Sequence, residues 1–245
     1  MKGYLAILIA VTWIGNVGAQ QLTEISSQDF LKEMKPVIEK MNQSNCKLKF
    51  KKEIYKDLRT NELISTSTGV VYYGSGNTFR MENEGVTIIQ TGDIYVIIDS
   101  LESLVQLTEP DKNFSPAMAV GNFNLEALSK FKLSYYKTTA YTTYKVIPDN
   151  LSEGTIEYQV DNKSGLIYRF KVSYPPANYF SETIDDETVE EPYAVVTYEP
   201  MEKIKNPAKL FDLAPYVVAS GDGKYVLSDK LINYELYDAR YHPIK

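Results

Sequence analysis

The chain has 245 residues, and its 26 lysines and arginines against 32 aspartates and glutamates give a formal net charge of −6. This acidic balance argues against nucleic-acid binding as the main role, because affinity for a phosphate backbone depends on clustered positive charge. The single cysteine, Cys46, excludes an intramolecular disulfide, so we expect the fold to depend on its apolar core.

Residues 1–19 predict a cleavable export signal. Lys2 supplies positive charge, the apolar run Tyr4–Val11 follows, and Val17 and Ala19 stand at the positions that a signal peptidase reads. The apolar run is too short to span a bilayer, although a retained anchor is an alternative. We therefore expect residues 20–245 to form a single domain that works in the periplasm. Secretion or attachment to the cell surface is the other option.

Residues 26–43 predict an amphipathic helix. Ser26 or Ser27 can cap its start, and Pro36 removes one backbone hydrogen bond and is expected to bend it. Its apolar residues fall on one stripe of a 3.6-residue period: Phe30, Leu31, Met34, Val37, Ile38 and Met41. Such a stripe is most often ordinary core, and its methionines are also typical of an adaptable binding surface.

After this helix the apolar period changes to two. Cys46, Leu48 and Phe50 alternate with lysines, which predicts a strand with one buried face. Further strands are expected at residues 63–73, 78–81, 86–90, 94–98, 104–107, 133–137, 142–147, 155–160, 166–174 and 193–198. A short second helix is expected at residues 123–131. Because short loops join consecutive strands, the sequence predicts an α+β fold with mainly antiparallel strands.

The residues that conventional catalysis requires are missing. The only histidine, His242, lies near the C-terminus, and Cys46 is on the apolar side of its strand. The densest acidic cluster, within residues 185–191, lacks the spacing of a calcium loop and indicates a solvated loop. We therefore expect no enzyme activity, no metal and no cofactor. A hydrolase with a carboxylate pair is the weakest alternative.

Four segments resemble the periplasmic lipoprotein carrier family, LolA and its relatives. Residues 30–82 (FLKEMKPVIEKMNQSNCKLKFKKEIYKDLRTNELISTSTGVVYYGSGNTFRME) resemble the family's opening helix and first two strands. Residues 86–107 (VTIIQTGDIYVIIDSLESLVQL) resemble a hairpin with a tyrosine-bearing strand. Residues 154–172 (GTIEYQVDNKSGLIYRFKV) and 206–213 (NPAKLFDL) resemble the late hairpin and the closing segment. The resemblance covers roughly residues 28–217.

The chain also departs from this family. Gly76-Asn77 stand where the family usually carries an Arg-Pro-like pair, and the nearest arginine, Arg80, follows Phe79. The role of the family's arginine is therefore not carried over to Arg80. Residues from about 214 onward extend beyond the family's usual end, so a specialised relative, or a different protein on the same scaffold, is an alternative.

The resemblance implies a strongly curved sheet, an incomplete barrel, wrapped around one or two helices and enclosing an apolar cavity for acyl chains. It implies a non-catalytic carrier or sensor whose partners are lipid or lipoprotein acyl chains and membrane-bound donor and acceptor proteins. The predicted cavity lining is Leu31, Met34, Ile38, Met41, Leu48, Phe50, Phe79 and Met81. Plain core packing is the more common role of such side chains. The alternative function is an interaction module that binds a glycan or a protein through an exposed aromatic sheet face.

Overall fold

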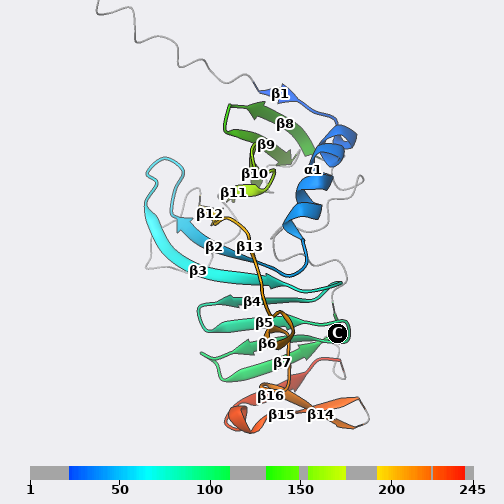
Figure 1. Ribbon diagram of the computed structural model, residues 1–245. Coiled ribbons are helices and arrows are strands. Elements are labelled where there is room, and N and C mark those ends of the chain that lie inside the picture. Colours follow the sequence, from blue (N-terminus) through cyan, green and yellow to red (C-terminus); the bar gives the residue numbers. More distant parts are fainter. Residues whose placement is uncertain (1–21, 111–130, 149–153, 175–191, 222, 241–245) are drawn as a thin grey trace, which may run out of the picture.

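A computed structural model describes residues 22–110, 131–148, 154–174, 192–221 and 223–240. Within these ranges the chain forms one α-helix, α1, and a large sheet of mostly antiparallel strands (Figure 1). The first eight elements are β1 (Thr23–Glu24), α1 (Ser27–Met41), β2 (Cys46–Tyr55), β3 (Leu63–Tyr73), β4 (Phe79–Asn83), β5 (Val86–Gln90), β6 (Tyr95–Asp99) and β7 (Leu104–Thr108).

A second run of strands and a C-terminal segment follow. The second run is β8 (Phe131–Lys137), β9 (Tyr141–Pro148), β10 (Thr155–Asp161), β11 (Ile167–Ser173), β12 (Tyr193–Tyr198) and β13 (Glu202–Lys203). The C-terminal segment contains the 3₁₀ turn η1 (Ala208–Leu210), β14 (Val217–Gly221), β15 (Lys224–Leu227), the 3₁₀ turn η2 (Asp229–Leu231) and β16 (Glu235–Asp238).

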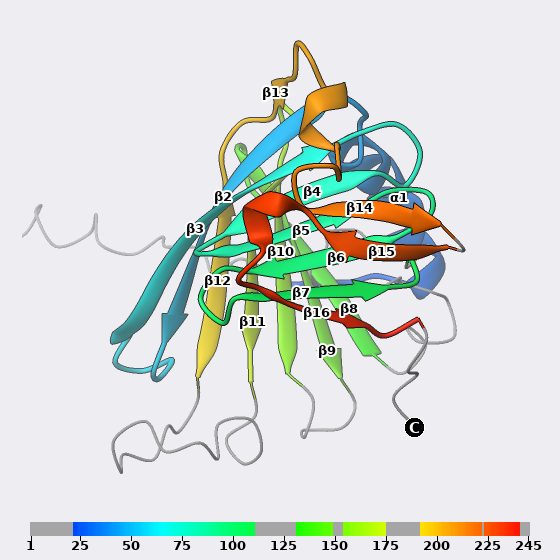
Figure 2. The same cartoon turned by 90° about the horizontal axis from the view of Figure 1, so that it is seen from below.

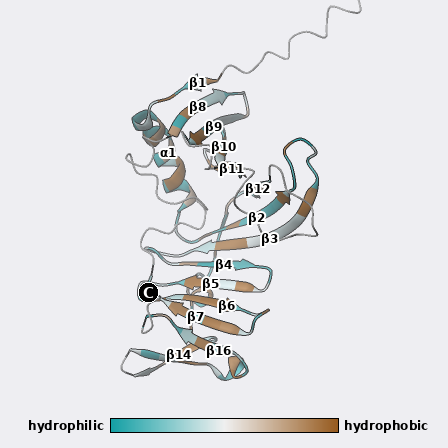
Figure 3. Ribbon diagram, turned by 180° about the vertical axis from the view of Figure 1, so that it is seen from behind, coloured by the Kyte–Doolittle hydropathy of each residue, from teal (hydrophilic) through white to brown (hydrophobic). Residues whose placement is uncertain are grey.

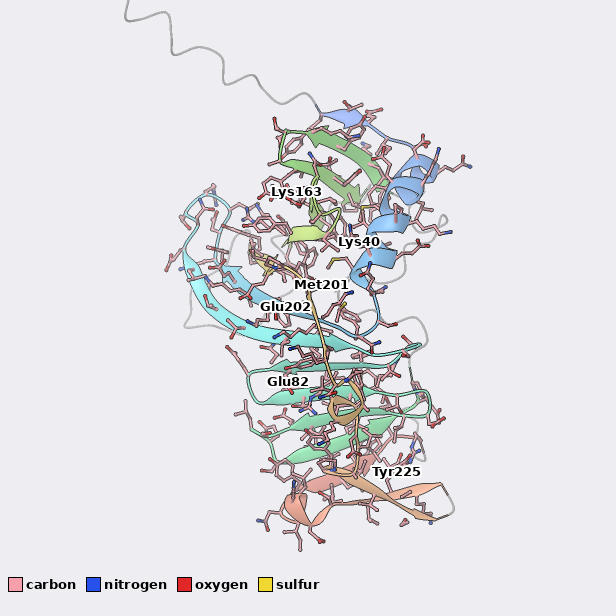
Figure 4. The ribbon with its side chains drawn as sticks, in the orientation of Figure 1. Lys40, Glu82, Lys163, Met201, Glu202 and Tyr225 are labelled. Carbon is pink, nitrogen blue, oxygen red and sulfur yellow. The ribbon has the colours of Figure 1, made fainter. Side chains whose placement is uncertain are left out.

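The predicted helix is confirmed, and its first turn shows why it starts where it does. Ser26 is the N-cap, and its hydroxyl accepts a hydrogen bond from the backbone N–H of Asp29. At the other end the Lys40 ammonium donates to the backbone carbonyl of Ser164, in the β10–β11 turn (Figure 4). The helix is therefore fixed at both ends, once by its own cap and once by the sheet.

The strands form one curved sheet in the order β1-β8-β9-β10-β11-β12-β2-β3-β4-β5-β6-β7-β16, with β13 beside β2. The two ends of this order do not pair with each other, so the sheet is an open, incomplete barrel, and the expected α+β class is confirmed. β12 joins the two runs by pairing with β2. In Figure 2 strands β8 to β12 lie at a steep angle to strands β4 to β7. The strand direction therefore changes at the long β2–β3 hairpin, which lies between the two groups.

One strand boundary needs correction, one strand was not predicted, and one expected helix falls outside the described residues. β4 continues to Asn83, and the turn is only Glu84-Gly85, because both residues take the positive φ that a two-residue hairpin requires. β16 pairs with β7 in parallel and was not predicted, because its partner is distant in sequence. The expected helix at 123–131 lies outside the described residues except for Phe131, which belongs to β8.

The main core lies between α1 and one face of the sheet, here called the helix face. Phe30, Met34 and Met41 of α1 are fully buried there against Leu48 of β2 and Tyr158 of β10. The strand register places Leu48, Val71 and Met81 side by side on this face. It also places Tyr144, Tyr158 and Phe170 side by side on the same face, on β9, β10 and β11. The alternation in β2 therefore predicted the buried side correctly, with Cys46 only 4% exposed.

A second core lies on the other face of the sheet, here called the back face. Its floor is formed by alternate residues of β5 to β7: Ile89, Val96, Ile98, Val105 and Leu107. The C-terminal segment covers this floor with Leu213, Val217 and Leu236, and lies at the β7 end of the sheet in Figure 1. The residues beyond 213 therefore complete a core and are an integral part of the fold.

Candidate functional site

The structure brings together seven of the eight residues predicted to line a cavity. Met34, Met41 and Leu48 are buried members of the core beneath α1. Four others are partly buried and pack against that core at its margin: Leu31, Ile38, Phe50 and Met81. The eighth, Phe79, is buried on β4, two residues before Met81, and contacts the Tyr95 ring edge-on. The predicted set therefore divides into a packed interior and a partly accessible rim.

An apolar row leaves this core and continues across the helix face from β3 to β6. Val71 pairs with Met81, Met81 with Ile88, and Ile88 with Ile97, so four strands present side chains in register. Val71 is buried, whereas Met81, Ile88 and Ile97 are only half-buried. With Leu48 at its covered end, this apolar row spans four inter-strand spacings, about 19 Å. We define the apolar row as Leu48, Val71, Met81, Ile88 and Ile97.

The sequence contained a signal for Ile88 and Ile97 that the period-two pattern did not reveal. Ile88-Ile89 and Ile97-Ile98 are adjacent apolar pairs, so in each strand both faces carry an isoleucine. Hydrophobic residues accordingly occupy much of β5, β6 and β7 in Figure 3. In each pair the back-face member is buried under the C-terminal segment, and the helix-face member belongs to the apolar row.

Polar contacts hold α1 over the covered end of the apolar row. The Tyr144 hydroxyl donates to the Glu33 carboxylate, and the Tyr144 ring meets Phe30 edge-on at 5.7 Å. Burial, and next the hydrogen bond to Glu33, raise the pKa of Tyr144 far above its ordinary value. The hydroxyl therefore stays protonated at physiological pH and can donate to α1.

A pocket of about 1040 Å³ lies along β2 to β5 and is lined mainly by back-face residues. Lysines of β2 line it, and each pairs with a glutamate: Lys47 with Glu202 at 3.0 Å, Lys49 with Glu199 at 3.4 Å and Lys51 with Glu53 at 2.7 Å. Figure 4 shows Glu202 beside β2, and on β4 it shows Glu82, which lines the pocket. Each of these three lysines is therefore already neutralised by a glutamate.

Neither a metal centre nor a membrane-spanning helix is found in the part of the chain that the structure describes. No three histidine, cysteine or acidic side chains gather there as ligands would. No described helix has both the length and the apolar character needed to cross a bilayer. The acidic cluster at 185–191, His242 and the export signal all lie outside the described residues. Their assignments stay predictions.

No protein-family model and no curated protein matches the sequence. Similar solved structures include a LolA superfamily protein from Nitrosomonas europaea, at 11% identity and a TM-score of 0.35, covering 77% of this chain and 98% of that one. An uncharacterized conserved protein from Thermus thermophilus is 11% identical, with a TM-score of 0.42 and coverages of 76% and 93%.

The Pseudomonas aeruginosa MucA/MucB complex is also similar, at 12% identity and a TM-score of 0.38. The match covers 82% of this chain but only 62% of that one. The solved structures similar to this chain thus include LolA-superfamily and lipoprotein-sorting domains, all at low identity. With identities and TM-scores this low, the similarity does not assign the chain to a family.

Proposed function

We propose that this protein is a non-catalytic binding module of the cell envelope that holds an acyl chain along the apolar row. The observation that carries the proposal is the continuity of the row: it begins in the core beneath α1 and continues half-buried across β4, β5 and β6. The solvent-facing side of an antiparallel sheet is usually polar. This face instead presents Met81, Ile88 and Ile97 side by side on three neighbouring strands.

The dimensions and the energetics of the apolar row suit such a ligand. Its length of about 19 Å is comparable with that of an extended long fatty-acyl chain. Each methylene removed from water contributes about 0.8 kcal/mol, so even partial burial of the chain offsets the cost of ordering it. The flexible Met81 at the boundary with the core, and Met34 and Met41 under α1, can adjust to a chain that enters between helix and sheet.

The aromatic alternative has less support from the geometry. Among the described residues, Tyr168 on β11 and Tyr237 on β16 are clearly exposed tyrosines, at 40% and 37%. These strands are far apart in the sheet order, so the two rings do not share a platform for a sugar. The Tyr168 ring stacks on the Tyr141 ring with their centres 5.2 Å apart. This contact between strands explains the position of Tyr168 without a ligand.

The test is fluorescence binding of cis-parinaric acid, together with native mass spectrometry of the purified protein for co-purified lipid. Ile97→Lys places a charge in the open part of the apolar row, where half-burial leaves the ammonium access to water, so the fold is expected to persist. We expect at least a tenfold loss of affinity. The matched control, Val226→Lys, alters a 48% exposed valine of β15 and should bind like the wild type. Absence of both co-purified lipid and parinaric acid binding would overturn the proposal.

A further inference from the structure

A small polar pocket lies on the back face of β8 to β11, away from the apolar row and from the C-terminal segment. Its volume is about 210 Å³, and its lining is Tyr136, Thr143, Glu157, Gln159, Arg169 and Lys171. Four of these form a cross-strand row, because Tyr136 pairs with Thr143, Thr143 with Gln159, and Gln159 with Arg169. Every lining side chain can form hydrogen bonds.

One lining group has hydrogen-bonding capacity that the described residues do not use. Thr143 is only 1% exposed, and its hydroxyl oxygen Oγ1 finds no hydrogen-bond partner among them. Buried hydroxyls in native proteins are nearly always paired, because an unpaired one loses its hydration without compensation. Since Thr143 lines the pocket, a ligand there would supply the missing partner.

The charges around the pocket leave positive charge available. The only acidic lining residue, Glu157, already pairs with Lys145 at 3.0 Å. The ammonium of Lys171 lies 4.4 Å from the centre of the Tyr193 ring, and burial lowers the pKa of Lys171. Arg169 is exposed, and within the described ranges its guanidinium makes no ion pair with a carboxylate. Arg169 therefore offers a cation to the pocket, and Lys171 lies beside it in the lining.

We infer that this pocket binds the oxyanion group of a small polar ligand, a phosphate or a carboxylate. A planar guanidinium recognises such a group through two parallel hydrogen bonds, and an ammonium adds a compact charge. The hydroxyls of Thr143 and Tyr136 and the Gln159 amide can bind further oxygens of the same ligand. The volume is suited to a head group or a single sugar acid and is too small for an acyl chain.

This inference does not rest on the proposed acyl-binding function. The pocket and the apolar row lie on different faces and on different strands of the sheet. Ile97→Lys is therefore expected to leave oxyanion binding unchanged. Arg169→Ala is likewise expected to leave parinaric acid binding unchanged, so the two proposals fail separately.

The test is isothermal titration calorimetry of the whole protein with three probes: inorganic phosphate, glycerol 3-phosphate and glucuronate. Saturable binding of at least one probe is expected, and the preferred probe distinguishes a free ion, a lipid-type head group and an acidic sugar. Arg169→Ala should weaken it at least tenfold. The matched control is Arg59→Ala, which removes an exposed arginine that already pairs with Asp57 at 3.0 Å and should change nothing.

Thr143→Val separates a ligand-binding hydroxyl from a structural one. Because valine has a similar shape and removes an unpaired buried hydroxyl, the melting temperature should stay equal or rise while affinity falls several-fold. Failure of all three probes to bind saturably would overturn the inference. Wild-type affinity in both Arg169→Ala and Thr143→Val would overturn it as well.

Discussion

The two halves of the sheet bury opposite faces. In the half formed by β8 to β12 with β2 and β3, α1 covers the helix face, and the back face carries charged pairs such as Lys145–Glu157. In the half formed by β4 to β7, the C-terminal segment covers the back face, and the helix face carries part of the apolar row. The same sheet therefore contributes one face to the main core and the other face to the second core. The comparison shows that the segment packed against the sheet, and not the strand sequence alone, determines which face of each half is buried.

Removing the cover of the second half should have the largest effect. Deletion of residues 213–245 exposes Ile89, Val96, Ile98, Val105 and Leu107 at once and leaves β7 as an open edge. Such a flat apolar edge is a template for aggregation. We expect the truncated protein to be insoluble or to bind the dye ANS strongly. A soluble, ANS-negative product would show that the second core does not depend on the C-terminal segment.

Two neighbouring residues of β5 allow a sharper comparison of the two faces. Ile89 is fully buried on the back face, whereas Ile88 is half-buried on the helix face. Ile89→Ala should lower the free energy of unfolding by about 3 kcal/mol, because it leaves a cavity. Ile88→Ala should cost less than about 1.5 kcal/mol and should mainly weaken acyl-chain binding. Urea denaturation measures both, and equal losses would contradict the assignment of faces.

Arg80 joins the sheet to the C-terminal segment, and its removal should have the smallest effect of the three. Its guanidinium pairs with Glu82 at 2.6 Å and donates to the Leu210 carbonyl at 3.3 Å and to the Tyr216 hydroxyl at 2.9 Å. Arg80→Met should cost about 1–3 kcal/mol in urea denaturation, since these acceptors lose their donor. Lys35→Met removes an exposed pair, with Glu39, and should cost about 0.5 kcal/mol or less. Equal losses would mean that Arg80 holds nothing in place.

The sequence predicted the elements better than it predicted what covers them. The alternation of β2 and the stripe of α1 give their buried faces directly, because one side of each element is polar and the other apolar. For β5 and β6 the alternation does not identify the buried face, since the pairs Ile88-Ile89 and Ile97-Ile98 place an apolar residue on both faces. Which isoleucine of each pair is buried depends on contacts with Val217 and Leu236 of the C-terminal segment. These residues are distant in sequence and reach the strands only in the folded protein.

The same contrast separates the two candidate sites. Four members of the predicted cavity lining, Leu31, Ile38, Phe50 and Met81, were identified as apolar residues of periodic segments, and each of them packs against the core beneath α1. The polar pocket around Thr143 was not predicted, because threonine, glutamine and arginine on alternate strand positions are ordinary surface residues in sequence. Only the register of four strands places them together.

The parallel pairing of β16 with β7 has a consequence for how the molecule is made. Glu235 lies beside Leu104 and Asp238 beside Leu107, so the last strand of the sheet joins one that leaves the ribosome much earlier. Contacts between such distant positions form slowly, because a long loop must close first. Until then β7 is an apolar strand with an unpaired edge. We therefore expect this half of the sheet to mature only after synthesis of the C-terminal segment, and to be the part that engages chaperones in the nascent chain.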